Sequence, residues 1–210
     1  MTLPEFYGIS ANFIKSRTDC FFSAKDISLF SFTANVNMKD FPQLFTDRLH
    51  LRKIHIDDIQ SLVKYANNRK VSDHILNIPH PYQEPDAVFR IRYVNEGFKT
   101  RSRYIFAIIL KEPEEFIGEI SLHLDDKNRM AQLAYWIGEP FWKNGFVTEA
   151  IQAILIFGFE KLDLDLIFAT CDEENIASIR VLEKNGFQKK GSAGSILQFA
   201  VERLKGKERP

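Results

Sequence analysis

The residues best suited to chemistry lie in one short segment between an apolar strand-like run and a long helical run. The segment reads Glu-Pro-Phe-Trp-Lys-Asn-Gly-Phe-Val-Thr-Glu-Ala over residues 139–150. The first turn of a helix carries backbone N–H groups without intrahelical partners, at the positive end of the helix dipole. Gly145 lets the backbone approach a ligand closely. The segment can therefore bind a phosphate or pyrophosphate, although a glycine before a helix is more often just a turn.

A second segment of interest covers residues 175–187, Asn-Ile-Ala-Ser-Ile-Arg-Val-Leu-Glu-Lys-Asn-Gly-Phe. Asn175 is a natural N-cap and Gly186 a natural C-cap, so helix capping alone explains both ends. Ser178 follows Asn175 by about one helical turn and points toward the same place. Capping does not explain why this segment occurs together with the glycine turn.

Two side chains are candidates for proton transfer. Glu119 and His123 share one face of the strand predicted at residues 116–124, because side chains alternate along a strand. Histidine has an intrinsic pKa of ~6.5, which suits a general base. A histidine at a strand end is more often a surface or packing residue, and Glu119 is more simply a solvated residue. Water that relays the proton to bulk solvent is the third alternative.

The elements that must position these residues follow from hydrophobic periodicity. Alternating or continuous apolar runs predict strands, and apolar spacings of three and four predict helices. Short turns join the strands of the middle of the chain into an antiparallel meander, and the C-terminal half alternates strands with helices, which favours parallel pairing. The expected fold is an α/β (α+β) mixed sheet flanked by helices. The predicted strands are 48–54, 103–110, 116–124, 130–138, 165–170 and 187 onward, and the predicted helices are 57–66, 86–98, 147–162 and 175–184.

Composition excludes several classes of protein. The 210 residues carry 28 basic and 28 acidic side chains, so the chain has no global field that would hold a nucleic acid. The two cysteines lack the spacing of a disulfide scaffold or zinc site, and no metal is expected. No apolar run is long enough to cross a membrane, and the N-terminus does not read as a secretion signal. A cytoplasmic protein is the simplest interpretation.

Residues 1–45 form an aromatic-rich extension ahead of the regular pattern. Eight phenylalanines and Tyr7 fall in this stretch, whereas disordered tails are poor in aromatic residues. Strand-like pieces such as residues 27–32 predict that much of it folds onto something. It would cover the sheet, make a homodimer contact or shape a substrate pocket. Residues 46–210 are then expected to form the main domain.

In this main domain the motifs together resemble the RimJ/RimL branch of the GNAT N-acetyltransferases. The resemblance extends from Thr-Asp-Arg-Leu at residues 46–49 to Asn-Gly-Phe at residues 185–187. Several motifs in register are more specific than any single one. The further matches are a central hairpin strand at 116–120, the fourth family strand at 134–138, and the two cofactor segments at 142–150 and 175–187.

The resemblance implies a GNAT fold, in which the sheet splays between its fourth and fifth strands and holds acetyl-CoA there. It implies transfer of an acetyl group to a primary amine, either a protein N-terminus or a small molecule. It also implies that Ser178 protonates the departing thiolate. The implied cofactor-binding residues are Tyr135, Trp136 and Ile137 on the strand edge, Trp142, Lys143, Asn144, Gly145, Phe146, Val147 and Thr148 in the phosphate turn, and Asn175 and Ser178 on the second helix.

The sequence departs from the family pattern at three positions. Gln132 stands where relatives commonly carry a glutamate that serves as a candidate base, and glutamine cannot take a proton. Lys143 replaces a frequent glycine and adds a charge that favours phosphate, whereas Val147 is bulkier than the usual residue and would crowd the cofactor. A catalytically weakened CoA-binding module is therefore the alternative to an enzyme.

The acceptor wall is expected at residues 75–98. Its arginines Arg90 and Arg92 are offset by Glu96, which gives no clear charge preference for the acceptor. Glu149, in the first turn of the helix after the phosphate turn, is interpreted as an acid that complements the helix dipole.

Overall fold

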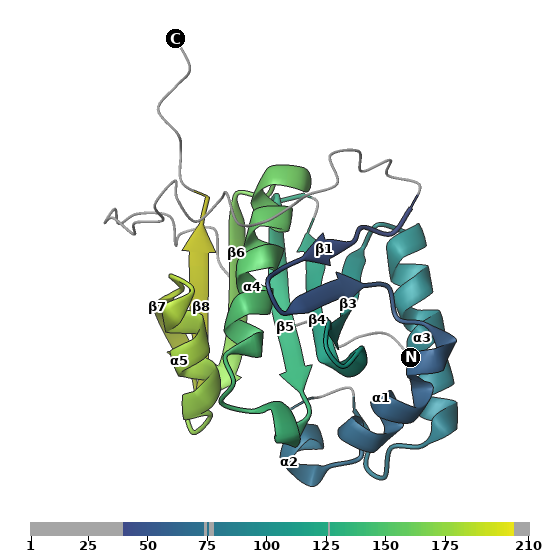
Figure 1. Ribbon diagram of the computed structural model, residues 1–210. Coiled ribbons are helices and arrows are strands. Elements are labelled where there is room, and N and C mark those ends of the chain that lie inside the picture. The colour runs from purple at the N-terminus through teal and green to yellow at the C-terminus, as the bar shows by residue number, and fades with distance from the viewer. Residues whose placement is uncertain (1–39, 74, 76–77, 126, 204–210) are drawn as a thin grey trace.

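A single sheet organises the computed structural model, which describes residues 40–73, 75, 78–125 and 127–203 (Figure 1). Its strand order is β1-β2-β3-β4-β5-β6-β8-β7. All neighbouring strands are antiparallel except β5 and β6, which are parallel. The strands are β1 Leu44–Phe45, β2 Leu49–Arg52, β3 Arg103–Leu110, β4 Glu115–Asp125, β5 Met130–Ile137, β6 Leu166–Asp172, β7 Gln188–Ala193 and β8 Ile196–Glu202.

Helices cover both faces of this sheet. Helices α4 and α5 pack with one core, which contains Phe106, Phe157 and Phe199. Helices α1 and α3 pack with a second core on the opposite face, around Ile105 and Trp136. The expectation of a mixed, mostly antiparallel sheet flanked by helices is confirmed. The helices are α1 Ile59–Ala66, α2 Arg69–Ser72, α3 Glu84–Lys99, α4 Phe146–Ile156 and α5 Ile176–Lys184.

The predicted meander is present as β2 to β5, but the C-terminal half differs from the expectation in one pairing. Parallel pairing occurs between β5 and β6, across α4. The next unit does not pair β6 with β7, because β8 folds back from β7 and inserts between them. Gly194 adopts a positive φ of 60° at the tight connection, where glycine is unstrained. The long helix also ends sooner than expected, since Phe157–Lys161 form a π-helical turn.

The folded unit begins before the boundary predicted at residue 45. Leu44 and Phe45 pair with β2, and the ring of Phe41 lies 4.9 Å from that of Phe106. These residues therefore belong to the sheet domain, because their side chains and backbone are used by its edge. The predicted strand at residues 27–32 lies outside the described residues. No helix in the described part of the chain is long and apolar enough to span a membrane.

Candidate functional site

Strands β5 and β6 separate soon after they meet. Their register contains only Met130 with Leu166, Ala131 with Ile167, and Gln132 with Phe168. Both strands continue beyond this point, β5 to Ile137 and β6 to Asp172. The splay expected between the family's fourth and fifth strands is confirmed, and it leaves the last five residues of β5 unpaired on that side.

Only alternate residues of β5 face the splay. The N–H of Gly138 donates to Ile117 O on β4 over 2.8 Å. Every second residue of β5 counted back from Gly138 therefore directs its backbone N–H and C=O toward β4. Leu133, Tyr135 and Ile137 therefore point their backbone groups into the splay. Ile137 O already accepts a hydrogen bond from the Trp142 indole over 2.8 Å.

Trp136 is a correction to the predicted strand edge. Its backbone N–H and C=O point toward β4, as those of Gly138 do. Its buried indole donates to Glu119 over 3.0 Å on the face of the sheet that α1 and α3 cover. Three consecutive residues cannot all line one strand edge, because the direction of the backbone groups reverses at each residue.

The turn before α4 is exposed and has an unusual backbone. Lys143 has φ 64° and Gly145 has φ 79°, both in the left-handed region. Gly145 is the N-cap of α4, and a Cβ built there would meet only Arg48 Nη2, at 3.6 Å. Trp142, Lys143, Asn144 and Gly145 are exposed, and Phe146, Val147 and Thr148 begin the helix with N–H groups that have no intrahelical acceptor. The turn can therefore bind an anion through its backbone.

An ion-pair network from the connection between β1 and β2 braces this turn. The Arg48 side chain donates to Glu149 over 2.7 Å and to Asn144 O over 3.0 Å, and its guanidinium lies 4.6 Å from the Phe146 ring centroid. The Thr46 hydroxyl donates to the same carboxylate over 2.5 Å. The network gives the Thr-Asp-Arg-Leu motif a physical role, because it fixes the turn to the neighbouring strand.

Glu149 therefore does more than complement the helix dipole. Partial burial opposes its ionisation, but hydrogen bonds from Thr46 and Arg48 outweigh that cost and set the pKa of the carboxyl below its ordinary value. The sequence predicted Glu149 at the correct helix end but gave no sign of its partners Thr46 and Arg48, which precede β2. Val147 packs against the core of the α4 face, so its side chain is directed at the protein interior.

Across the splay, Tyr135 on β5 meets Ser178 on α5. The two hydroxyl oxygens are 2.6 Å apart. Burial raises the pKa of Tyr135 to about 12, against a lowering effect of the Ser178 hydrogen bond, so the phenol remains protonated at neutral pH. Asn175 caps α5, because its side-chain oxygen accepts from Ser178 N over 3.1 Å. The structure brings Ser178 and Asn175 to the cleft as predicted, whereas the contact with the Tyr135 side chain was not foreseen.

On the α3 face, Glu119 is buried at 2% exposure and its lone pairs are occupied. Arg90 Nη2 and Nε donate to Glu119 Oε2 over 2.7 and 3.1 Å, and the Trp136 indole donates to the same oxygen. The interpretation of Glu119 as a solvated residue is wrong, because α3 covers it. Arg90 and Trp136 therefore occupy this carboxylate, and it does not project toward an acceptor amine.

His123 lies on the same face near the apex of the splay. Burial, followed by the positive charges of Arg90 and Arg103, lowers the pKa of His123 to about 4. Its Nε2 is 3.2 Å from the Ser121 hydroxyl oxygen. His123 is therefore neutral at pH 7 but binds a proton weakly. Gln132, its register partner on β5, contacts Thr170 Oγ1 across the apex at 3.5 Å.

Comparisons with known proteins agree on one family. The family model described as "Acetyltransferase (GNAT) domain" matches residues 48–188. An uncharacterized N-acetyltransferase p20 from Bacillus licheniformis is 34% identical over 149 residues, which are 70% of this chain and 83% of that protein. The [Ribosomal protein uS5]-alanine N-acetyltransferase of Escherichia coli is 27% identical over 74% of this chain and 82% of its own length.

Solved structures show the same fold. The microcin C7 self-immunity acetyltransferase MccE, in complex with acetyl-CoA and AMP, superimposes with a TM-score of 0.67 at 19% identity. The match covers 75% of this chain and 94% of MccE.

Proposed function

Because this chain belongs to the GNAT acetyltransferase family, we propose that it transfers the acetyl group of acetyl-CoA directly to a primary amine while both substrates are bound. The observation that carries the proposal is the splay of β5 from β6 next to the exposed turn that begins α4. An extended arm that ends in a diphosphate needs an unpaired strand edge and a set of free N–H groups, and the two occur side by side here.

The residues of the cleft fit such a ligand. The open space around Gly145 admits a phosphate next to the N–H groups of Phe146, Val147 and Thr148. The exposed Lys143 adds a positive charge at the same turn. The backbone groups of Leu133 and Tyr135 are available to an extended arm in the way that a neighbouring strand would use them.

Acetyl-CoA supplies a thioester that a neutral amine can attack without a covalent enzyme intermediate. Catalysis then rests mainly on positioning and on a donor for the developing oxyanion, which we assign to a β5 N–H that faces the splay. Ser178 donates a proton to the leaving sulfur and regains one from solvent, and the Tyr135 hydroxyl, 2.6 Å away, holds the Ser178 hydroxyl in place.

The amine must lose a proton, and the three side chains considered for this role are poorly placed or poorly suited to take it. Gln132 cannot accept a proton, Glu119 is held by Arg90, and the pKa of His123 is about 4. We therefore assign proton removal to water at the half-exposed apex, which relays the proton to bulk solvent.

The same observations favour a second candidate, a module that binds CoA and has lost turnover. Calorimetry with acetyl-CoA tests the part that both candidates share, because each requires binding in the cleft. Thiol release with a panel of amines and N-terminal peptides, read by mass spectrometry for the acetylated product, then separates them. Binding without any product would support the module, and absence of binding would overturn both.

The chemical class of the acceptor is proposed from the names of relatives. One relative is named for an alanine N-terminus of ribosomal protein uS5, and one structural neighbour for spermidine. The panel should therefore contain short peptides with free N-termini as well as polyamines.

A further inference from the structure

A row of four half-buried side chains crosses the sheet at the apex of the splay. Arg103 on β3 is the register partner of His123 on β4, His123 that of Gln132 on β5, and Gln132 that of Phe168 on β6. Partners in register project to the same face of a sheet, which here is the α3 face. Because the row ends where β5 and β6 part, it leads from the proposed reaction centre toward α3.

The two arginines near this row differ in how their charges are compensated. Arg90 is neutralised by the buried carboxylate of Glu119 at 2.7 Å. Arg103 has no carboxylate within 4.0 Å in the part of the chain that the structure describes. The charge balance of Arg90, Arg103 and Glu119 is therefore one net positive charge, located at Arg103.

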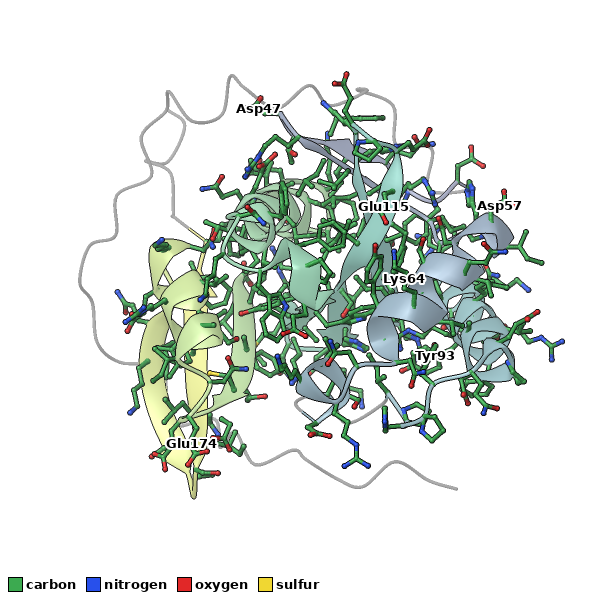
Figure 2. All side chains as sticks on the ribbon, turned by 60° about the horizontal axis from the view of Figure 1, so that its bottom comes forward. Asp47, Asp57, Lys64, Tyr93, Glu115 and Glu174 are labelled. Carbon is green, nitrogen blue, oxygen red and sulfur yellow. The ribbon has the colours of Figure 1, made fainter. Side chains whose placement is uncertain are left out.

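Arg103 is held in place by packing. Its guanidinium carbon lies 3.8 Å from the Tyr93 ring centroid, and its stem lies against Gly97 of α3, where an added Cβ would approach Arg103 Nε to 2.1 Å. The Nε atom is buried and has no hydrogen-bond partner. Because this Nε is covered by α3, an acceptor can meet Arg103 only through the Nη groups of its half-buried guanidinium. Tyr93 marks the α3 side of the site in Figure 2.

His123 lies between Arg103 and Gln132, and its pKa reflects the electrostatic potential there. After burial, the charges of Arg90 and Arg103 are the causes that lower its pKa. Burial, the larger cause, disfavours a charge of either sign, but the contribution of the two arginines shows that the potential at His123 is positive.

We propose that Arg103 binds a carboxylate on the acceptor. The enzyme would then prefer amines whose acidic group lies about two strand spacings from the reacting nitrogen. The proposal rests on the proposed acetyl transfer at the splay. Adjacent strands are about 4.8 Å apart, which places Arg103 roughly 10 Å from the β5 edge where the amine must react. An acidic side chain at the second residue of a peptide reaches that far from the N-terminal amine. Arg92 and Glu96, whose opposite charges offset each other in the predicted acceptor wall, are both exposed on α3.

The test compares matched acceptors. C-terminally amidated Ala-Glu-Ala-Ala and Ala-Gln-Ala-Ala differ in one charge, and 6-aminohexanoate and 6-aminohexanamide provide the small-molecule pair. We expect a kcat/KM about ten-fold higher for the acid of each pair, as for one charge-assisted hydrogen bond. A preference in only one pair would identify whether the carboxylate belongs to a peptide or a small amine.

Four variants assign the preference to its residue. Arg103→Gln should reduce the acid-to-amide ratio to about one, and Arg103→Lys should retain part of it. Arg103→Met keeps the apolar stem against Gly97, and it replaces Arg103→Gln if thermal melting shows that the latter is unfolded. Lys99→Gln removes one positive charge from an exposed site at the end of α3, outside the predicted acceptor wall, and should leave the ratio unchanged.

Binding is measured alongside turnover, by fluorescence anisotropy of labelled peptides with CoA-saturated protein. This separates the two proposals, because acetyl transfer fails if no amine is acetylated, whereas the carboxylate site is still decided by the acid-to-amide affinity ratio. Equal affinities and rates for acid and amide in the wild type, or an unchanged ratio in Arg103→Gln, would overturn the assignment.

Discussion

The two sides of the splay, which we propose hold the cofactor and the acceptor, are built on different principles. On the α4 and α5 side, the groups proposed to meet the cofactor are mainly main-chain N–H and C=O groups of β5 and of the turn at Gly145. On the α3 side they are side chains from separate elements, with a buried ion pair between Arg90 and Glu119 and a second arginine beside it. A main-chain site tolerates varied side chains but depends on backbone shape, whereas a side-chain site changes with each substitution.

The largest expected effect tests the main-chain character of the cofactor side. Gly145→Asp places a carboxylate where a phosphate should bind and forces an L-residue into φ 79°. We expect acetyl-CoA binding, measured by calorimetry, to fall below detection. Gly145→Asn is the matched control, because asparagine tolerates the left-handed region and adds no charge. It should retain most of the affinity, and equal losses in both variants would mean that shape rather than charge governs the turn.

The next effect concerns the brace between α4 and the connection that precedes β2. Arg48→Ala removes the hydrogen bonds to Glu149 and Asn144 and loosens the turn. We expect KM for acetyl-CoA to rise about ten-fold with a smaller change in kcat, because only the preorganisation of the binding site is lost. Asp47→Ala, at the exposed neighbouring position, should leave KM unchanged. A decrease in kcat at constant KM would show that the brace does not serve the cofactor.

How far each side could be predicted from sequence follows from this difference. The glycine turn and the Asn175 cap were found because a main-chain site leaves a local signature of glycine, helix start and helix cap. The prediction for Trp136 is wrong because neighbours in sequence do not share a strand edge. The backbone groups reverse direction at each residue.

The acceptor side was harder to predict because its contacts are long-range. Arg90 and Glu119 are 29 positions apart, and nothing local marks them as partners. The Tyr135–Ser178 contact joins positions 43 apart in the same way. Each contact joins a helix to a strand, so both depend on how α3 and α5 pack on the sheet, which the sequence pattern does not specify.

A middle-sized effect is expected at Ser178, where the two principles meet, because its backbone N–H donates to the Asn175 cap and its hydroxyl contacts Tyr135. Ser178→Ala should lower kcat several-fold, by roughly 1 kcal/mol, since thiolate is already a good leaving group. The Kd for acetyl-CoA should change little. Tyr135→Phe should lower kcat less than Ser178→Ala, because it removes only the supporting hydroxyl. A normal kcat in Ser178→Ala would remove the acid role from this residue.

The smallest effect is expected for the pH dependence associated with His123. Its pKa of about 4 lies below the ordinary value, so the ring stays neutral from pH 5.5 upward and titrates only under acid conditions. Between pH 5.5 and 8, kcat/KM should therefore rise with pH only because more of the amine is neutral, and level off near the acceptor's own pKa, about 8 for a peptide N-terminus. His123→Asn should reproduce this profile. An inflection near 6.5 that disappears in His123→Asn would show instead that the histidine takes the amine proton, and would make the acceptor side an acid–base centre rather than a surface that only positions its substrate.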